Sequence, residues 1–227
     1  MAARLSRPFS SRAASRRTLS TSTSRRHGAC WNCAASVECE RDRFFCRRCE
    51  RIQPVDVCPQ DYFDCFRLAR RFDVDFQELQ SRFRRLQAVV HPDKFSTGSE
   101  KERSLAEQQS SFVNRAYSVL SRPLSRSEYL LESMGAETPT RDHITDADFL
   151  MEMLELNEEV HDTEDSERLG RLRADAADAL ASGSAQLRAH YAAGDVDKAR
   201  RLTAKLHYYE RLLENASKRL EARSAAG

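Results

Sequence analysis

The sequence has few residues that interrupt helices. Its 227 residues include only seven glycines and six prolines, beside abundant leucine, alanine, arginine and glutamate, a balance that favours helices over sheets. No apolar run approaches the roughly eighteen residues that a membrane span needs, so no membrane partner is expected. There is no glycine-rich phosphate loop, and no histidine has a nucleophile and a carboxylate nearby in sequence. The sequence therefore predicts an all-α protein that is not an enzyme.

Acidic residues are missing from the N-terminal region, where the first carboxylate is that of Glu38. Residues 1–26 combine many arginines and serines with isolated apolar side chains. This composition is typical of a mitochondrial transit peptide and lacks the continuous apolar core of a secretory signal. A basic arm that touches nucleic acid is the alternative. We expect 1–26 to be a disordered transit peptide and the protein to act in the mitochondrial matrix, with a cytoplasmic pool left open.

Four of the seven cysteines form two Cys-x-x-Cys pairs, and these are Cys30, Cys33, Cys46 and Cys49. Each pair can present two thiolates on one tight turn, and two such turns supply the four sulfurs of a tetrahedral zinc. A redox dithiol is less favoured, because it needs only one pair. We expect a zinc-ribbon-like segment over 27–56 with a closed, structural zinc site. The remaining three, Cys39, Cys58 and Cys65, are expected to be ordinary thiols, because an odd count argues against a disulfide framework.

The second cysteine pair lies among arginines, and these are Arg41, Arg43, Arg47, Arg48 and Arg51. With Phe44 and Phe45 they supply the ingredients of a nucleic-acid module. The alternative is that both phenylalanines pack the small metal domain. The rest of the chain offers no second basic platform, so nucleic acid is not expected as a partner and stays a minor hypothesis.

A periodic apolar pattern predicts a helix ending near residue 90, with Phe76, Leu79, Phe83, Leu86 and Val90 on one buried side. Asp75 and Glu78 have the spacing of a capping box at its start.

The opposite side of this helix is basic and carries Arg82, Arg84 and Arg85, with no carboxylate between Glu78 and Asp93. Pro92 disfavours a helical conformation for His91, which leaves His91, Pro92 and Asp93 on an exposed turn.

A basic helix followed by His91-Pro92-Asp93 resembles a J-domain. Its setting makes the likeness specific, because Asp-Phe-Gln-Glu-Leu precedes it at 75–79 and the stretch 112–120 resembles a J-domain's third helix. The segment Arg-Ser-Glu-Tyr-Leu-Leu at 126–131 resembles the close of the J-domain in the HscB family of iron-sulfur co-chaperones. Some eukaryotic members of that family carry a tetracysteine domain before the J-domain, and the arrangement of cysteines in this sequence resembles theirs.

The predicted J-domain covers 60–135 and forms a hairpin of helices. Its first helix is expected over 61–71, with Phe63, Phe66 and Phe72 facing the core. A helix from Lys101 packs antiparallel to the basic one. A short helix then runs from Pro123 to Gly135, and 136–141 is the expected hinge.

The predicted C-terminal unit, 142–224, is a three-helix bundle. The family resemblance implies that this bundle binds the client protein of the co-chaperone. Its first helix begins with a capping box of Thr145 and Asp148, and its buried seam is Phe149, Met153, Leu156 and Val160. Leu150 and Leu154 lie off this seam, and a client site or a second packing face explains them equally well from periodicity alone.

The second helix, over 165–190, has a potential break at Gly183. The last helix carries a seam of Ala199, Leu202, Leu206, Tyr209, Leu213, Ala216 and Leu220, with Tyr208 and Leu212 off it.

The resemblance implies two partners. A DnaK-type ATPase chaperone would dock on His91, Pro92, Asp93, Lys94, Arg82, Arg84 and Arg85. An IscU-type iron-sulfur scaffold would contact Leu150, Met151, Leu154, Glu155, Glu158 and Tyr208, with Tyr209 as the alternative to the last. Recipient iron-sulfur proteins and a homodimer stay open as further partners. The competing hypotheses are a general J-protein for another client and a zinc-ribbon nucleic-acid binder.

Overall fold

The computed structural model describes residues 28–137 and 144–224, and the predicted transit peptide lies outside them. The elements, in chain order, are α1 (Cys39–Asp42), η1 (Val55–Val57), α2 (Tyr62–Cys65), α3 (Phe76–Val90), η2 (Pro92–Phe95), α4 (Glu100–Ser121), α5 (Pro123–Ser133), α6 (Ala147–Asp162), α7 (Ser166–Ala193) and α8 (Val196–Ser224). β pairing within these ranges is limited to two isolated bridges, Ala29 with Ser36 and Phe45 with Ile52. The all-α prediction is therefore confirmed, and none of the described helices is long and apolar enough to span a membrane.

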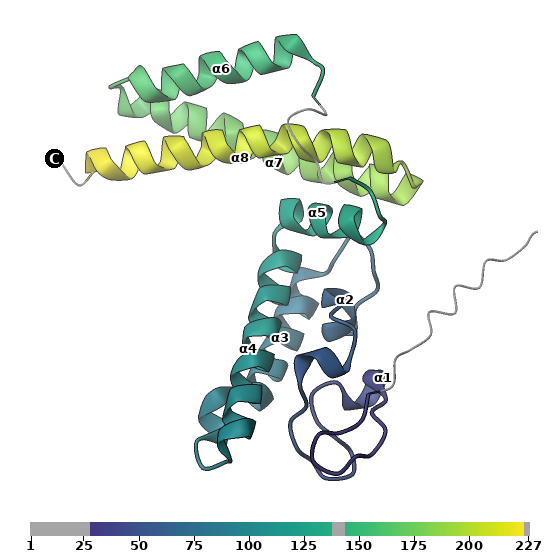
Figure 1. The fold of residues 1–227 in the computed structure, drawn as a ribbon. Coiled ribbons are helices and arrows are strands. Elements are labelled where there is room, and N and C mark those ends of the chain that lie inside the picture. The colour runs from purple at the N-terminus through teal and green to yellow at the C-terminus, as the bar shows by residue number, and fades with distance from the viewer. Residues whose placement is uncertain (1–27, 138–143, 225–227) are drawn as a thin grey trace, which may run out of the picture.

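Helices α3 and α4 form the hairpin of the J-domain, with α2 packed beside them (Figure 1). Phe83 of α3 stacks on Tyr117 of α4 with ring centroids 4.1 Å apart. Leu79 and Val90 are fully buried in the shared core. Phe76 is 51% exposed, against the prediction. Side chains tilt toward the N-terminus of a helix, so the first residue of α3 points beyond the packed part of the hairpin.

The first helix of the J-domain is shorter than predicted, because α2 ends at Cys65 instead of continuing to residue 71. Arg67 has a φ of 53°, which a helix cannot continue through. The guanidinium of Arg82 donates to the carbonyls of Phe66 and Arg67 at 2.6 and 2.5 Å. A side chain of α3 therefore takes up backbone oxygens that a longer helix would have bonded internally. Phe63, Phe66 and Phe72 are buried, as predicted.

Helices α7 and α8 form a long hairpin (Figure 1), and α6 packs mainly on α8 to complete the bundle. The N-cap of α6 is Asp146, whose carboxylate accepts from the amide of Phe149 at 3.1 Å. The predicted capping box was therefore misplaced by one residue. Leu212 was predicted to lie off the seam of α8, yet it is buried with Leu169 and Leu172 of α7. The seam shifts because α8 contacts α5, α6 and α7 at different points of its length.

Helix α7 runs through Gly183 without interruption, so the break predicted there is wrong. A Cβ atom on Gly183 would lie 2.3 Å from Cδ2 of Leu206 in α8. The glycine permits close contact of the two helices rather than ending one of them. Gly194 does end α7, with a φ of 72°.

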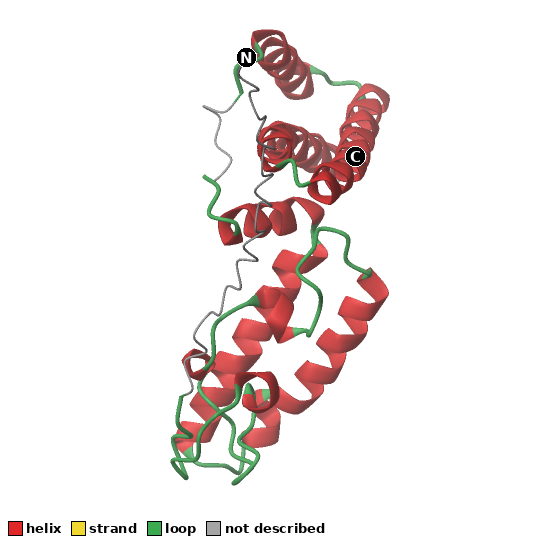
Figure 2. Ribbon diagram, turned by 90° about the vertical axis from the view of Figure 1, so that its right-hand side faces the viewer, coloured by secondary structure: helices red, strands yellow, loops and turns green. Residues whose placement is uncertain are grey.

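The J-domain shares one buried core with α7 and α8 of the bundle. Leu187, Ala199 and Leu206 of the bundle belong to the same buried cluster as the J-domain side chains. Helix α5 lies between the hairpin and the bundle in both views (Figure 1, Figure 2). The hydroxyl of Ser127 in α5 is hydrogen-bonded to Tyr191 Oη at 2.8 Å and to Thr203 Oγ1 at 2.7 Å. Buried polar contacts thus fix the orientation of the two units.

The two glycines inside α7 test this close packing. A Cβ on Gly170 meets nothing within 4 Å, so Gly170→Ala should stabilise the protein by roughly 1 kcal/mol through helix propensity. Gly183→Ala carries the same propensity gain but displaces the buried Leu206, and overpacking of a core typically costs about 1–3 kcal/mol. Urea unfolding should therefore rank Gly170→Ala above the wild type and Gly183→Ala below it. Equal stability of the two variants would contradict the close contact.

Candidate functional site

The His-Pro-Asp turn joins α3 to α4 at the end of the hairpin that points away from the bundle (Figure 1). His91 caps α3 by donating its amide to the carbonyl of Gln87 at 3.0 Å, and Pro92 begins η2. The amide of Asp93 donates to Nδ1 of His91 at 3.4 Å. The side chains of His91 and Asp93 are 53% and 89% exposed. The turn therefore exposes both side chains to solvent.

The basic face of α3 is smaller than predicted. Arg82 is half-buried and donates to the carbonyls of Phe66 and Arg67. It also pairs with Glu78 at 2.5 Å. Glu78 lies one turn earlier, so the helix itself supplies the carboxylate that neutralises this arginine. The Glu78 carboxylate accepts from Arg82 instead of from the backbone at the start of the helix, so the predicted capping box does not form. Asp75 alone caps the helix. Arg84, Arg85 and Lys94 remain as exposed cations around the turn.

An apolar patch lies on α6, which we define as Leu150, Met151 and Leu154 with the exposed carboxylates of Glu155 and Glu158. Met151 and Leu154 are 58% and 54% exposed. Leu150 is half-buried in a cluster with Phe149. The turn and the α6 patch are not brought together, because α6 lies on the side of the bundle away from the J-domain hairpin (Figure 1).

Tyr208 and Tyr209 both pack on Phe149, at centroid distances of 5.7 and 5.9 Å. Tyr209 also packs against the core shared with the J-domain, and its burial raises its pKa. Tyr208 packs in the cluster beside α6. The choice of Tyr208 as the client-facing residue stays a prediction, and its position beside α6 supports it.

The four predicted cysteine ligands come together. Their sulfurs all lie within 4.8 Å of one another, with Cys30 Sγ 3.6 Å from Cys49 Sγ and Cys33 Sγ 3.7 Å from Cys46 Sγ. Sulfurs bound tetrahedrally at about 2.3 Å from one ion stand roughly 3.8 Å apart. The arrangement is thus consistent with a structural metal site.

Hydrogen bonds at the cluster favour thiolates unequally. Burial opposes ionisation of Cys30, but bonds from the amides of Cys33 and Asn32 outweigh it and lower its pKa to about 6. The amide of Ala35 favours a thiolate at Cys33, whereas burial and the neighbouring sulfurs raise its pKa to about 11. Four thiolates this close repel one another, so a cation is what would allow all four to ionise.

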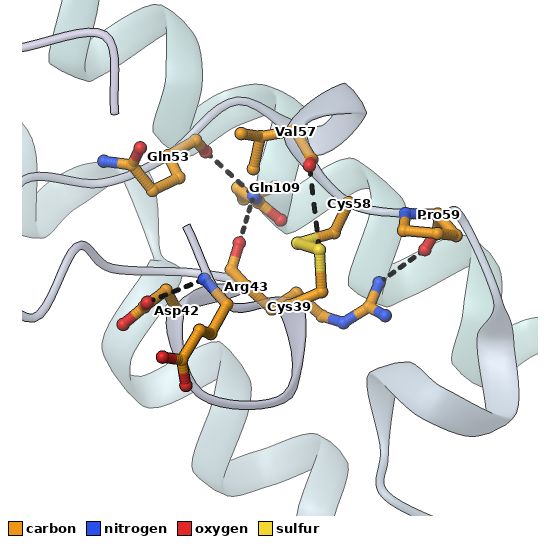
Figure 3. Close-up of a disulfide and its surroundings, with 9 residues drawn as sticks. Cys39, Asp42, Arg43, Gln53, Val57, Cys58, Pro59 and Gln109 are labelled. Carbon is orange, nitrogen blue, oxygen red and sulfur yellow. Dashed lines mark hydrogen bonds between the residues drawn. A yellow bond between two sulfur atoms is a disulfide. The ribbon is translucent and has the colours of Figure 1, made fainter. Parts of the chain in front are cut away.

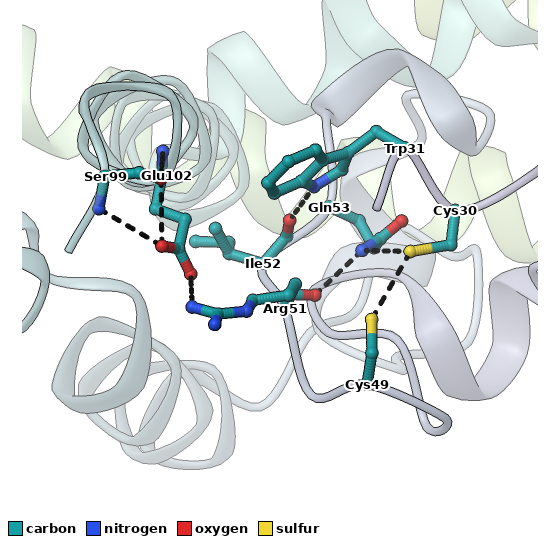
Figure 4. A network of polar contacts seen from close by, with 8 residues as sticks. All are labelled: Cys30, Trp31, Cys49, Arg51, Ile52, Gln53, Ser99 and Glu102. Atoms are coloured by element: carbon teal, nitrogen blue, oxygen red, sulfur yellow. Dashed lines mark hydrogen bonds and ion pairs between the residues drawn. The ribbon is translucent and has the colours of Figure 1, made fainter. Parts of the chain in front are cut away.

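Gln53 belongs to the same network and was missed in the sequence. Its Nε2 donates to Cys30 Sγ at 3.4 Å and to the carbonyl of Arg51 at 2.8 Å (Figure 4). Its position four residues after Cys49 gave no signal, because a neutral amide is common near any turn.

Cys39 and Cys58 form a disulfide (Figure 3), so their prediction as ordinary thiols is wrong. Their Cα atoms are 5.4 Å apart, within the normal range for a disulfide. The chain between them folds back through the second cysteine pair, which brings the two residues together. An odd number of cysteines outside a metal site leaves the pairing open, so counting alone could not find this bond. Burial raises the pKa of the remaining thiol, Cys65, to about 12.

Three of the five arginines of the cysteine segment pair with carboxylates of the protein, and these are Arg41, Arg47 and Arg51. Arg47 pairs with Asp42 at 2.9 Å, Arg51 pairs with Glu102 at 2.5 Å, and Arg43 donates to the carbonyl of Pro59 at 2.8 Å. Phe44 and Phe45 are half-buried against the J-domain instead of forming a stacking platform. These contacts disfavour nucleic acid as the partner.

Comparison with known proteins identifies two segments. Residues 61–129 match the DnaJ domain, and 145–217 match the family described as HSCB C-terminal oligomerisation domain. The chain is 35% identical over 187 residues to the iron-sulfur cluster co-chaperone protein HscB of Mus musculus and to that of Homo sapiens. These alignments cover 82% of the chain and 80% and 79% of the two relatives.

The fold is similar to the crystal structure of human co-chaperone protein HscB, with a TM-score of 0.76 and 34% identity. That alignment covers 83% of this chain and 96% of the human one. The similarity spans the J-domain, the bundle and their junction, and so the chain belongs to the HscB family of J-domain co-chaperones in iron-sulfur cluster assembly.

Proposed function

We propose that the protein binds an IscU-type iron-sulfur scaffold on the α6 patch and stimulates a DnaK-type ATPase chaperone through the His-Pro-Asp turn, in the mitochondrial matrix. One observation carries this proposal: the two exposed surfaces lie on opposite parts of a body in which the J-domain shares a buried core with α7 and α8, and α6 packs on α8. Both partners can therefore bind together, and the scaffold is held at a fixed position relative to the chaperone. The chemistry is the partner's ATP hydrolysis, and no catalytic role is assigned to this chain.

The turn recognises its partner by charge and shape. Asp93 can accept charge-assisted hydrogen bonds from an arginine of the chaperone. Arg84, Arg85 and Lys94 increase the rate of encounter with an acidic surface and set the orientation of docking. The proposed role of Arg82 is indirect, because its contacts with Phe66 and Arg67 hold α2 against α3.

The α6 patch suits a partner with an apolar centre and basic surroundings. Burial of Met151 and Leu154 would remove apolar surface from water, the main favourable term in such contacts. Glu155 and Glu158 would attract basic residues around that centre. We propose Tyr208 as the aromatic neighbour of the patch, with recipient proteins and homodimer formation left outside this site.

We further propose that the four clustered cysteines hold zinc. Four thiolates complete a tetrahedral zinc and leave no open position, so the ion would serve the fold of the segment. The cysteine segment has almost no other core, which fits a domain that depends on a metal.

A general J-protein for another client is the alternative. It shares the turn but gives no reason for two half-exposed apolar side chains among carboxylates on α6. A measurement of scaffold binding therefore distinguishes the proposed function from that of a general J-protein.

Asp93→Asn should abolish stimulation of the chaperone while scaffold affinity and thermal stability stay unchanged. The amide keeps the shape of the side chain but removes its charge, and the side chain is almost fully exposed. Steady-state ATP hydrolysis with chaperone, scaffold and protein checks this. Asp64→Asn, an exposed carboxylate on α2, is the matched control and should stimulate normally. Stimulation by the Asp93 variant at the wild-type level would refute the role of the turn.

Met151→Ala combined with Leu154→Ala should weaken scaffold binding by roughly tenfold or more, about 1.4 kcal/mol. Both side chains are more than half exposed, so the bundle should remain stable. Leu150 is a poorer target, because its half-buried side chain also packs the bundle. Titration calorimetry measures the affinity, and Met134→Ala removes a similarly exposed methionine from the C-cap of α5 as a control. Unchanged affinity would show that the scaffold does not bind the α6 patch.

Purified protein should contain about one zinc per chain, the stoichiometry of a four-cysteine site. Cys33→Ser should lose the ion, and Cys65→Ala should keep it because Cys65 lies in the J-domain core. Elemental analysis gives the zinc content of each variant. Full zinc occupancy in the Cys33 variant would show that the cluster is not the site.

A further inference from the structure

The cysteine segment contacts the same turn that presents His91, Pro92 and Asp93. Phe95 ends η2, two residues after Asp93, and its ring stacks on Phe45 with centroids 6.5 Å apart and planes 14° apart. Phe95 and Phe45 pack with Trp31 against buried Ile52, Leu105 and Ala106. Three of these six residues belong to the cysteine segment and two to the start of α4. The only large apolar side chain of η2 is therefore enclosed partly by a different unit of the protein.

Polar contacts reinforce this junction at the first turns of α4. Arg51 pairs with the buried carboxylate of Glu102 at 2.5 Å. Glu102 also completes a capping box with Ser99, so one carboxylate connects the cysteine segment to the start of α4 (Figure 4). Trp31 Nε1 donates to the carbonyl of Ile52 at 2.7 Å, and Lys101 Nζ lies 4.2 Å from the centre of the indole ring.

The same contacts lead directly to the clustered cysteines. Arg51 and Ile52 follow Cys49 in sequence, and the carbonyl of Arg51 accepts from the amide of Cys46 at 3.0 Å. Phe45 precedes Cys46 and is bridged to Ile52. The side chains that hold Phe95 and Glu102 are thus carried by the loop that holds the second cysteine pair.

Besides Phe95, the turn is held by the start of α4, where Arg103 donates to the carbonyl of Ser96, and by hydrogen bonds within the turn. Lys94 donates its amide to the carbonyl of His91 at 3.0 Å, Ser96 to that of Asp93 at 3.4 Å, and Gly98 to that of Phe95 at 2.9 Å. These local bonds are short-range, and the His91 and Asp93 side chains are exposed. An isolated single-turn 3₁₀ element is weakly stable without a packed side chain. Phe95 is that side chain.

We infer that the cysteine segment is a positioning element for the His-Pro-Asp turn, in which Phe45 and Arg51 hold η2 and the start of α4 in the conformation that the ATPase partner binds. The functional half of this inference rests on the proposed function, whereas the ordering of the turn does not. Fixing the turn before binding lowers the conformational entropy that docking would otherwise cost. Phe45 and Arg51 are positioning residues, since they act through Phe95 and Glu102.

Phe45→Ala in the full chain tests this, with Phe44→Ala as the matched control. Phe44 is the adjacent half-buried phenylalanine, but it packs in the J-domain core instead of against Phe95. Hydrogen exchange should speed up by roughly tenfold at the amides of Lys94, Ser96 and Gly98 in the Phe45 variant only. The protein concentration for half-maximal ATPase stimulation should rise roughly three- to tenfold, with the maximal rate unchanged, because a less ordered turn binds more weakly.

Arg51→Gln provides a second variant in case Phe45→Ala loses the fold of the segment. Arg51 is half-exposed, so its replacement should preserve the segment and increase exchange in the turn to a smaller extent. Exchange in the turn that stays at the wild-type rate in both variants overturns the inference. Equal acceleration in Phe44→Ala also overturns it, because it would indicate general loosening. A wild-type protein that stimulates no ATPase refutes the proposed function instead, and the exchange data then still decide whether the segment orders the turn.

Discussion

The packing of α5 on the hairpin of α7 and α8 is the interaction on which the arrangement of the two surfaces depends. Ser127, Tyr191 and Thr203 form a hydrogen-bonded set in the interior of this contact. Phe72 of the J-domain stacks on Tyr191 at 5.1 Å. His207 of α8 is hydrogen-bonded to Glu128 of α5 at 2.8 Å, and this bond raises the pKa of the histidine. A rotation between the units would leave buried hydroxyls without partners, so the relative orientation is specific.

The same helix explains why the segment at 126–131 has its particular residues. Arg126 is buried, donates to the carbonyl of Leu120 at 2.6 Å and lies over the ring of Phe72 at 4.9 Å. The hydroxyl of Tyr129 accepts from the amide of Tyr62 at 3.0 Å and so closes the start of α2. Leu130 and Leu131 are fully buried. The segment therefore joins three parts of the protein: the end of α4, the short α2 and the core shared with the bundle.

The cysteine segment is attached to the opposite end of the J-domain and depends on different physics. It has a small apolar core, a disulfide and a cluster of sulfurs in place of a large buried surface. Most of its arginines contact carboxylates or a carbonyl of the protein. Charge that appears available for an external partner in the sequence is mostly paired within the segment, and Arg51 pairs with Glu102 of α4. The cysteine segment contacts the J-domain beside the His-Pro-Asp turn.

Several features could be predicted from local sequence because local physics determines them. Periodic apolar residues gave the long helices, and Pro92 ended α3 where predicted. Two Cys-x-x-Cys pairs gave the sulfur cluster, since each pair preorganises two ligands over four residues. The exposed turn and the apolar residues off the seam of α6 followed in the same way, although their binding roles remain proposals.

Other features depended on contacts between residues distant in sequence. Arg82 does not belong to the exposed basic face, because its guanidinium donates to the carbonyls of Phe66 and Arg67, which come near it only in the folded protein. Gly183 is a packing position because Leu206 comes against it from another helix. Cys39 and Cys58 meet because the loop between them folds back on itself. The sequence by itself determined the helices and the candidate surfaces through short-range periodicity and spacing. Only the tertiary structure decided which charges are satisfied and which units touch, because those depend on long-range packing.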